Sequence, residues 1–265
     1  MPTKSNTVTC IVVSYDTPEL LLKQVSKLRN SEVGVVISDN HAENTPQDIK
    51  ISTDQYKYLD NGSNIGFGAA ANRGAQEAKS EWLLFLNPDV EITSDAIKNF
   101  VKQAEDAKLD ACCPKTSDTR YTHPLPSIWW FLGTYTPLKR IPVFLRQAQK
   151  YPITLWGGCL LIRRAIFEKF GGFDERFFLW FEDSDLTKRL IDGGYKIGYL
   201  PVDGLRHQGG ASFHTLPEVE KRKLFFQSAY TYTTIHGSWL DRLVVRLLQL
   251  RYGGLIPHTS VKTHI

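Results

Sequence analysis

The feature that most constrains the fold of this chain is a set of short apolar runs that alternate with helical patterns. The run at residues 8–14 is rich in β-branched side chains, and a helical pattern that begins with a proline follows it over residues 18–29. A second run covers residues 33–38, and a third covers residues 82–86 after a helical stretch at 69–79. Strands that alternate with helices predict an α/β fold with a mostly parallel sheet covered on both faces.

The polar residues that end these three runs are the first candidates for a binding site. In a parallel sheet, ligands bind beyond the carboxyl ends of the strands. We therefore expect three polar pairs to converge on one edge of the sheet. These pairs are Ser14 with Tyr15, Asp39 with Asn40, and Asn87 with Asp89.

Length, charge and cysteine usage limit the kind of protein. A chain of 265 residues with 42% hydrophobic and 23% charged residues fits one large globular domain. The net charge of +4 suits anionic partners such as nucleotide phosphates or acidic lipid headgroups, and does not require nucleic acid. The four cysteines form neither a disulfide framework nor a zinc spacing, and the polar N-terminus lacks a secretory signal. These features predict buried thiols in a cytoplasmic protein that does not cross a membrane.

Two residues far apart in the chain are candidate ligands for a divalent metal. Asp89 follows an apolar strand in the segment NPDVEI, where Pro88 fixes the backbone. His207 lies in LRHQGGAS, where a neutral imidazole could complete an oxygen-rich shell and the next two glycines would permit a close phosphate approach. The alternatives are that Asn87 and Asp89 cap a turn and that the histidine is structural.

A cluster of three carboxylates, Glu182, Asp183 and Asp185, lies between the aromatic run at 177–181 and a helical pattern. Crowded carboxylates beside aromatic side chains should raise one another's pKa, which suits a general base. The alternative is that Asp183 or Asp185 caps the N-terminus of the helix. Capping explains one carboxylate, but three in four positions exceed what a cap needs.

The glycine-rich loop NGSNIGFGAAANRG, at residues 61–74, does not match the dinucleotide-binding pattern GxGxxG. No acidic residue ends a further strand where that fingerprint requires one, so a nicotinamide-dependent enzyme is disfavoured. The glycines instead indicate a backbone that passes near a nucleotide or sugar. An ordinary strand-to-helix turn is the alternative.

Two later segments differ in character from the rest. Residues 116–152 are rich in proline, carry the run Trp129-Trp130-Phe131 and include Lys139, Arg140 and Arg146, which is typical of a variable insertion. From Glu218 the chain looks helical to its end, and residues 240–252 combine leucines with arginines. Both segments could contact a membrane, as an aromatic wedge and a basic amphipathic helix. Equally, both could pack against the domain or a second subunit.

Taken in order, seven segments of the chain resemble the bacterial family 2 glycosyltransferases, and above all their rhamnosyltransferase-like branch. The similarity runs from Val8 to Ser212, roughly four-fifths of the chain, and the ordered set is more specific than any one motif. The segments are VVSYDTPELL, ISDN, NGSNIGFGAAANRG, FLNPDVEI, WGGCLLIRR, GGFDERFFLWFEDSDLTKRL and HQGGAS.

This resemblance implies a GT-A fold and a role for each matching residue. Asp89 matches the last position of the family's DxD metal motif, whose first position is Asn87 here, and His207 matches a later metal-binding histidine. Asp183 matches the catalytic base. The donor-binding residues implied are Ser14, Tyr15, Asp39, Asn40, Asn64, Gly66, Asn72 and Asn87. The acceptor-binding residues implied are Trp156, Gly157, Gly158 and Glu182.

The C-terminal part follows the family pattern less well. Lys221 or Arg222 could close over the donor diphosphate, but His236 stands where the pattern leads us to expect a lysine. We expect a GT-A domain over residues 1–237 and a basic amphipathic tail over residues 238–265.

The resemblance implies an inverting single displacement, dependent on Mg²⁺ or Mn²⁺, that moves rhamnose from dTDP-rhamnose to a hydroxyl of a saccharide or lipid-linked saccharide. Surface-glycan assembly at the inner face of the cell membrane would suit such an acceptor. Two alternatives remain open: transfer from a UDP-sugar, and a binding module that has lost catalysis. The sequence leaves the oligomeric state open.

Overall fold

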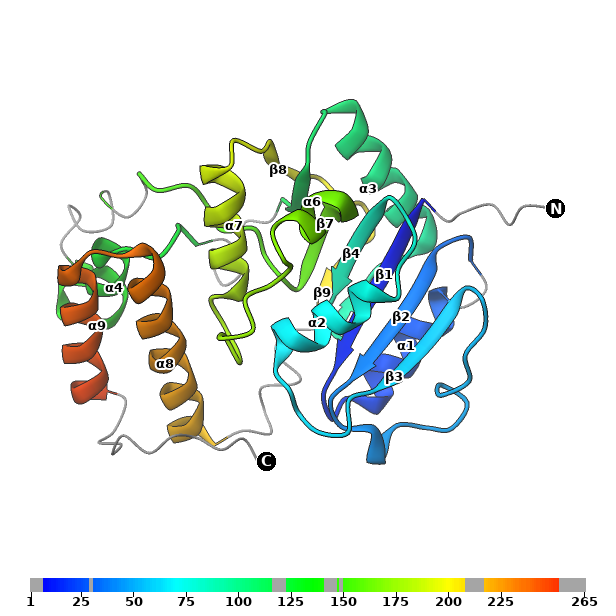
Figure 1. Cartoon of the computed structure of the whole chain (residues 1–265), viewed down its shortest axis with the longest axis horizontal. Coiled ribbons are helices and arrows are strands. Elements are labelled where there is room, and N and C mark those ends of the chain that lie inside the picture. Colours follow the sequence, from blue (N-terminus) through cyan, green and yellow to red (C-terminus); the bar gives the residue numbers. More distant parts are fainter. Residues whose placement is uncertain are drawn as a thin grey trace.

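The computed structural model describes residues 7–28, 31–115, 123–140, 147, 150–207 and 217–252. Within them, one seven-stranded sheet has the order β3-β2-β1-β4-β7-β6-β8 (Figure 1). Its strands are β1 (Val8–Ser14), β2 (Gly34–Asp39), β3 (Tyr56–Asp60), β4 (Trp82–Leu86), β6 (Ala111–Pro114), β7 (Cys159–Arg163) and β8 (Ile197–Leu200).

The sheet is mixed but mostly parallel, as the sequence predicts. Strands β3, β2, β1 and β4 run parallel to one another, whereas β7 is antiparallel to both of its neighbours, β4 and β6. Strand β8 is parallel to β6. The central strands β1 and β4 are buried along their whole length, because helices cover both faces of the sheet.

Side chains that alternate along the strands divide the core into two layers. Cys10 and Val12 of β1 face the helices α1 (Pro18–Leu28) and α3 (Ser94–Asp106). Ile11 and Val13 face the helices α2 (Phe67–Gln76), α6 (Arg164–Lys169) and α7 (Glu182–Asp192). This two-residue periodicity is what a strand buried on both sides requires.

The carboxyl ends of β1, β2 and β4 lie along one edge of the sheet, so the polar pairs that follow them converge as expected. The backbone N–H of Asn40 donates to the carbonyl of Ser14 at 2.8 Å. Beyond β4, the short strand β5 (Val90–Glu91) pairs with β9 (Arg206–His207), and Val90 lies opposite His207. This two-stranded ribbon brings the end of β4 to a residue more than a hundred positions away.

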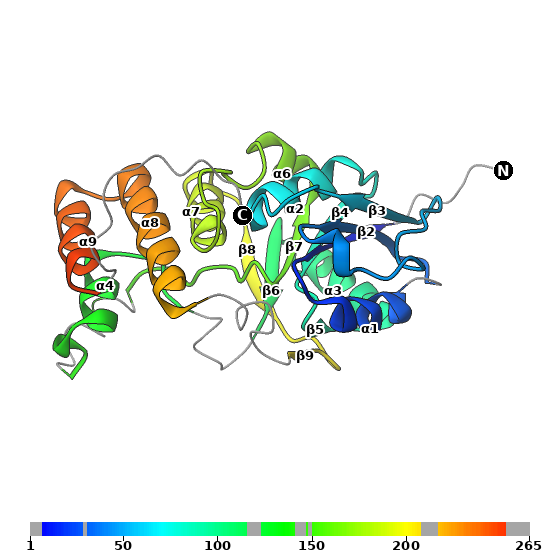
Figure 2. The same ribbon diagram turned by 90° about the horizontal axis from the view of Figure 1, so that it is seen from below.

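A third, aromatic core lies at the end of the molecule away from β3. It is formed by α4 (Ile128–Tyr135), α8 (Glu218–His236) and α9 (Trp239–Tyr252), which lie side by side with α7 between them and the sheet (Figures 1 and 2). We call these three helices the helical unit. A short 3₁₀ helix, η2 (Pro137–Arg140), follows α4, and another, η1 (Ala42–Asn44), follows β2.

One expectation about the later segments needs correction. Trp129-Trp130-Phe131 is not an exposed wedge, because Phe131 is fully buried and Trp130 packs edge-on against it and Phe181. After Glu218 the described chain is helical as expected, in two helices that are separated at Gly237, where α8 ends with an extended residue. The expected insertion and tail therefore meet in the helical unit. Residues 208–216 and 253–265 lie outside the described part, as does Arg146.

Three smaller points complete the comparison. Helix α2 begins at Phe67, two residues before the expected start, and strand β3 and helix α3 were not expected. All four cysteines are free and buried, as predicted. Among the described helices, none is both long and apolar enough to span a membrane.

Candidate functional site

The two candidate metal ligands, Asp89 and His207, lie together. His207 Nε2 is 3.1 Å from Asp89 Oδ2, and the two side chains are only 12% and 8% exposed. The β5–β9 ribbon positions both, because Val90 of β5 is paired with His207 of β9. A carboxylate and an imidazole supply two ligands, and the described residues contain no group of three or more His, Cys, Asp or Glu side chains suited to a metal.

A single turn, Trp156-Gly157-Gly158, connects this pair to the carboxylate cluster. The Trp156 ring lies 5.0 Å from the His207 ring between centroids. The N–H of Gly157 donates to Asp183 Oδ2 at 3.2 Å, and the carbonyl of Gly158 accepts from the N–H of Asn87 at 3.0 Å. A Cβ at Gly157 would stand 3.2 Å from the Asp183 Cβ. Glycine therefore permits the close approach of this turn to Asp183.

The three clustered carboxylates have different surroundings. Asp183 is partly exposed, whereas Glu182 is 7% exposed and Asp185 is 1% exposed. Asp183 also accepts a hydrogen bond at 2.7 Å from the N–H of Ser184. Of the three, Asp183 is thus the carboxylate that an incoming hydroxyl group can reach.

The expected N-cap role for Asp183 or Asp185 is wrong. The N-cap of α7 is Phe181, whose backbone is left-handed with φ 70° and whose side chain makes no capping bond. Trp180 before it is also left-handed, with φ 66°. Two consecutive non-glycine residues in this region are strained, so surrounding packing must hold the turn. Both carboxylates lie instead in the first turn of α7, where the helix dipole favours negative charge.

Glu182 is the carboxylate whose titration is most perturbed. Burial, with the adjacent Asp183 charge adding to it, raises the pKa of Glu182 to about 8. Its Oε2 atom is buried and has no hydrogen-bond partner among the described residues. The sequence predicted a raised pKa within this cluster, and the structure assigns it to Glu182.

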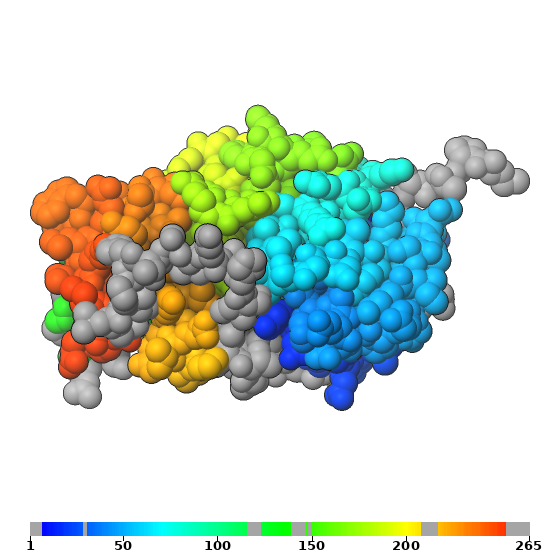
Figure 3. Space-filling view, turned by 60° about the horizontal axis from the view of Figure 1, so that its bottom comes forward, coloured from blue at the N-terminus to red at the C-terminus, as the bar shows by residue number. Residues whose placement is uncertain are grey.

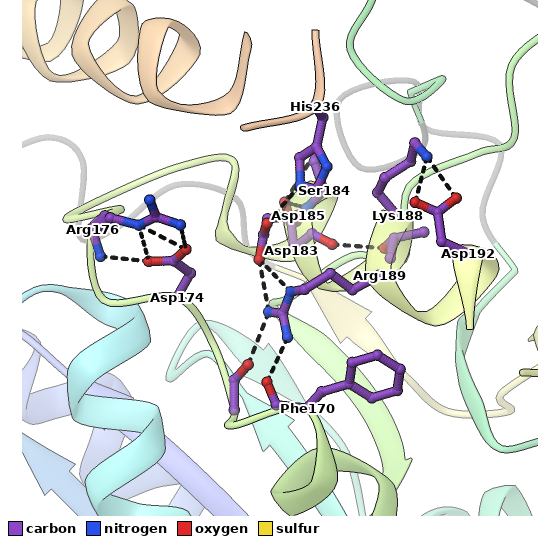
Figure 4. A network of polar contacts seen from close by, with 12 residues as sticks. Phe170, Asp174, Arg176, Asp183, Ser184, Asp185, Lys188, Arg189, Asp192 and His236 are labelled. Carbon is purple, nitrogen blue, oxygen red and sulfur yellow. Dashed lines mark hydrogen bonds and ion pairs between the residues drawn. The ribbon is translucent and has the colours of Figure 1, made fainter. Parts of the chain in front are cut away.

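Asp185 is the centre of a polar network that joins three parts of the chain (Figure 4). Its Oδ1 lies 2.7 Å from His236 Nε2 at the end of α8, and its Oδ2 accepts from Arg189 Nε at 2.8 Å. Arg189 donates in turn to the carbonyls of Phe170 at 3.0 Å and Gly172 at 2.9 Å. Helix α7, with Asp183, is therefore fixed both to the loop after α6 and to the helical unit.

Asp39, which we expect to contact the donor, is fully buried at the end of β2. Its Oδ2 accepts from Thr45 Oγ1 at 2.5 Å and from Tyr58 Oη at 2.8 Å, and its Oδ1 accepts from the N–H of His41 at 3.1 Å. A carboxylate has about four acceptor positions, so Oδ1 can accept one more hydrogen bond. Tyr15 lies beside this group, with its ring 5.8 Å from the His41 ring.

Asn40 organises the glycine-rich loop. Its amide nitrogen donates to the carbonyl of Gly66 at 3.2 Å, and its Oδ1 accepts from Asn61 Nδ2 at 2.9 Å. Gly66 has φ 86°, and a Cβ there would stand 2.5 Å from the carbonyl oxygen of Phe178. The N–H of Gly66 donates to Asn64 Oδ1 at 3.1 Å. Glycine is thus required at position 66, where the loop passes the segment leading into α7.

Asn72 has a different setting from the other expected donor residues. It is 9% exposed, and its amide donates to the carbonyl of Phe173 at 2.8 Å while its Oδ1 accepts from the N–H of Phe173 at 2.8 Å. These bonds hold α2 against the loop before α7, and both segments meet on the face shown in Figure 3. Contact between Asn72 and a donor remains a prediction, and its observed bonds serve positioning.

The comparison with protein families agrees with this geometry. The model described as glycosyl transferase family 2 matches residues 9–171, more than half of the chain. The chain belongs to this family. A second model, described as the N-terminal domain of galactosyltransferase, matches residues 146–209. The protein is therefore a family 2 glycosyltransferase, and the family resemblance of its ordered motifs is confirmed.

Two relatives match this glycosyltransferase over most of its length. The N-acetylglucosaminyl-diphospho-decaprenol L-rhamnosyltransferase of Mycobacterium tuberculosis is 28% identical over 225 residues, which cover 71% of this chain and 71% of the relative. The dTDP-rhamnosyl transferase RfbF of Shigella flexneri is 22% identical, with 78% and 70% covered. These names support the rhamnosyltransferase-like branch.

A solved structure confirms the GT-A fold. The mannosyltransferase PcManGT from Pyrobaculum calidifontis, in complex with GDP-Man and Mn²⁺, matches 94% of this chain and 76% of its own with a TM-score of 0.57. Sequence identity is 15%, so the match concerns the fold alone.

One expected residue lies on a different element from the Asp89–His207 pair, and two residues beside Asp39 were not anticipated. Arg222 lies on α8 in the wall of a pocket with Tyr135 and Trp180, and no contact among the described residues joins it to Asp89 or His207. Thr45 and Tyr58, which bind the Asp39 carboxylate, were missed by the sequence reasoning, because neither belongs to a recognisable motif.

Proposed function

We propose that this glycosyltransferase transfers rhamnose from dTDP-rhamnose, with inversion, to a hydroxyl of a lipid-linked saccharide. The observation that carries the proposal is the turn at 156–158, which connects the Asp89–His207 pair to the accessible carboxylate of Asp183. In this proposal the diphosphate departs at the Asp89–His207 pair, and the base for the attacking hydroxyl lies beside it. The names of the relatives support the donor sugar and the lipid-linked acceptor.

The nucleobase is assigned to the edge of the sheet beside Asp39. A thymine or uracil ring presents an imide N–H, and the remaining acceptor position on Asp39 Oδ1 would bind it. Ser14, Tyr15 and Asn40 line the same edge of the sheet, and Asn64 and Gly66 lie on the loop that follows β3. Guanine also carries a ring N–H, so a panel of nucleotides is needed to separate the bases.

Asp89 and His207 fit a divalent cation shared with the donor. Mg²⁺ is commonly held by one or two carboxylates together with substrate phosphates, which matches a site with only two protein ligands. Asn87, in place of a second carboxylate, would leave one less charge beside it. When bound, the cation would neutralise the charge that develops on the diphosphate leaving group.

Asp183 acts as the general base. Its two oxygens are oriented by the N–H groups of Gly157 and Ser184, and its partial exposure admits the acceptor. The acceptor hydroxyl gives its proton to Asp183 as it attacks the anomeric carbon from the face opposite the diphosphate, and this geometry inverts the configuration. Trp156, Gly157, Gly158 and Glu182 surround this position and shape the acceptor site.

The exposed apolar face of α9 contacts the membrane that holds the lipid-linked acceptor. Val245 and Leu248 of α9 are buried in the helical unit, but four leucines at spacings of three and four residues are exposed. An amphipathic helix with an exposed apolar stripe and basic flanks lies at the surface of an anionic bilayer. The exposed leucines, which we call the leucine stripe, are Leu240, Leu243, Leu247 and Leu250.

Two measurements test the proposal. In thermal-shift assays with Mg²⁺ or Mn²⁺, dTDP should raise the midpoint more than UDP or GDP, because a ligand that binds only the native state stabilises it. A larger shift with UDP would mean that the donor is a UDP-sugar rather than dTDP-rhamnose. Transfer from dTDP-rhamnose should stop on chelation with EDTA and return with added metal. If EDTA left the activity unchanged, Asp89 and His207 would not bind a metal that the reaction needs.

The role of Asp183 needs a variant that keeps the fold. Asp183→Asn should lower kcat by about 10² to 10⁴, the usual contribution of a general base, and leave the Kd for dTDP unchanged. Asp192→Asn, at the exposed end of the same helix, is the matched control. Full activity in Asp183→Asn would refute the mechanism, and the anomeric configuration of the product, read by NMR, tests inversion separately.

A further inference from the structure

A pocket of about 680 Å³ opens between α4 and α8, beside the carboxylate cluster and separate from the Asp39 end of the sheet. Half of its lining residues are aromatic, and its volume is within the range of small-molecule sites. The side chains that matter for recognition are Tyr135, Trp180, Lys221, Arg222 and Phe225.

The apolar wall comes from three different parts of the chain. Phe225 of α8 lies 5.2 Å from Tyr135 of α4 and 6.0 Å from Trp180 between ring centroids. Phe226 lies 5.5 Å from Phe225 and is itself buried. Aromatic walls of this kind offer a large apolar surface against which an apolar chain can be buried.

The charge at the pocket is positive. Lys221 and Arg222 are adjacent residues in the first turns of α8, and the described lining contains no carboxylate. Lys221 pairs at 2.7 Å with Glu218, whose own side chain is 74% exposed and therefore well hydrated. Arg222 forms no ion pair with a carboxylate among the described residues, so its guanidinium is available to a phosphate group.

The pocket is joined to the active site by the left-handed turn before α7. Trp180 forms part of the pocket wall and stands three positions before Asp183. Phe181 between them is anchored in the aromatic core, against Phe131 and Phe225. A ligand in the pocket would therefore lie next to the segment that carries the base.

We propose that this pocket binds the isoprenoid diphosphate part of the acceptor, with the diphosphate on Lys221 and Arg222 and the first apolar units against Trp180 and Phe225. The inference rests on the lipid-linked acceptor of the proposed function. It reassigns Arg222 from the donor diphosphate, where the family pattern led us to expect it, to the acceptor. Tyr252 of α9 also lines the pocket, so an apolar chain can leave it toward the helix that carries the leucine stripe.

The test is equilibrium binding of farnesyl diphosphate to the full-length protein without donor sugar, followed by calorimetry. Farnesyl diphosphate should bind at least tenfold more tightly than either farnesol or inorganic pyrophosphate, because the pocket recognises both parts. Arg222→Ala and Lys221→Ala should each weaken this binding about tenfold, and an excess of dTDP should not displace the ligand. Lys223→Ala removes the same charge from the next residue of α8, outside the pocket wall, and should bind normally.

Each other outcome overturns the assignment. Displacement of farnesyl diphosphate by dTDP would mean that Lys221 and Arg222 bind the donor diphosphate instead. If farnesol bound as tightly as farnesyl diphosphate, the pocket would not recognise the diphosphate. If pyrophosphate bound as tightly, the pocket would not recognise the apolar chain. If farnesyl diphosphate did not bind, the pocket would not be an isoprenoid diphosphate site. Because the assay contains no sugar transfer, it distinguishes failure of this site from failure of the rhamnosyl-transfer proposal, which the Asp183→Asn and nucleotide assays address.

Discussion

The two ends of this glycosyltransferase are built in different ways. At the edge of the sheet that we propose binds the donor, which we call the donor end, buried polar side chains bond to one another, as Asp39 does with Thr45 and Tyr58. In the helical unit, the core is aromatic and the polar contacts lie at its boundary. Ser228 Oγ on α8, for example, donates at 2.7 Å to the carbonyl of Leu179, in the segment before α7.

Helix α7, which carries the proposed base Asp183, lies at the junction of these two ends. Asn72 holds the loop before it from the donor side, and His236 holds Asp185 from the helical unit. Asp183 is positioned by neither end alone. The comparison therefore predicts that substitutions at the junction affect the molecule more than substitutions within either end.

The largest effect is expected for Asp185→Ala, which removes the buried centre of the junction. Arg189 and His236 would both lose their charged partner, and breaking a buried ion pair in this way costs about 3 to 5 kcal/mol of unfolding free energy. Urea denaturation followed by circular dichroism measures the loss. Asp192→Ala, which breaks an exposed pair with Lys188 on the same helix, should change stability by less than about 1 kcal/mol. Similar losses in both variants would mean that the buried Asp185 contributes no more to stability than an exposed ion pair on the same helix.

The next effect is a pH dependence of stability that arises from Glu182. Its pKa is about 8 in the folded protein and near 4.5 when unperturbed, so between these values the native state binds more protons than the unfolded state. The contribution of Glu182 to stability is complete below pH 4.5 and is lost as pH rises toward 8, by at most about 1.4 kcal/mol per pH unit for one proton.

Glu182→Gln should remove this dependence. The variant should therefore gain in thermal midpoint relative to the unmodified protein as pH rises from 5 to 8. Glu43→Gln, at an exposed carboxylate that follows β2, supplies the control for an acidic residue on the surface. Parallel curves for the unmodified protein and Glu182→Gln would contradict the raised pKa.

The sequence predicted the donor end better than the helical unit, and the reason is physical. Strand β4 was predicted to the residue, because five consecutive apolar side chains bounded by turn residues define a strand buried on both faces. Strand β3 was missed, because it lies at the edge of the sheet and its sequence YKYLD has only one buried side chain. Local patterns report burial, so an edge strand leaves a weak signal.

Contacts between distant residues could not be derived from local patterns. Asp89 and His207 were proposed as metal ligands from their local segments and from the family resemblance, since nothing in a spacing of more than a hundred residues indicates that β5 and β9 are neighbours. Phe131 and Phe181 stack in the aromatic core, yet Phe131 lies in the segment predicted to be a variable insertion. The same limit applies to His236, which departed from the expected lysine and proved to be the partner of Asp185.

A smaller effect is expected within the donor end, for Tyr58→Phe. This change removes one of three hydrogen bonds to Asp39 and leaves the others, so unfolding free energy should fall by about 1 kcal/mol and the Kd for dTDP should rise a few-fold. Chemical denaturation and calorimetry measure the two quantities. Tyr195→Phe should change neither, because among the described residues the Tyr195 hydroxyl accepts only from the exposed Lys169. A loss as large as that of Asp185→Ala would make the donor end as critical as the junction.

The smallest effect on stability is expected on the leucine stripe, at the outer surface of the helical unit. Leu247 is 57% exposed, so Leu247→Gln should change the unfolding free energy by less than about 0.5 kcal/mol, whereas it should weaken co-sedimentation with vesicles that contain anionic phospholipid. Val219→Gln, at an exposed apolar residue of α8 outside the stripe, is the matched control and should bind vesicles normally. If both variants bound vesicles as the unmodified protein does, the stripe would have no part in membrane contact. A large loss of stability in Leu247→Gln alone would instead mean that another protein surface covers it.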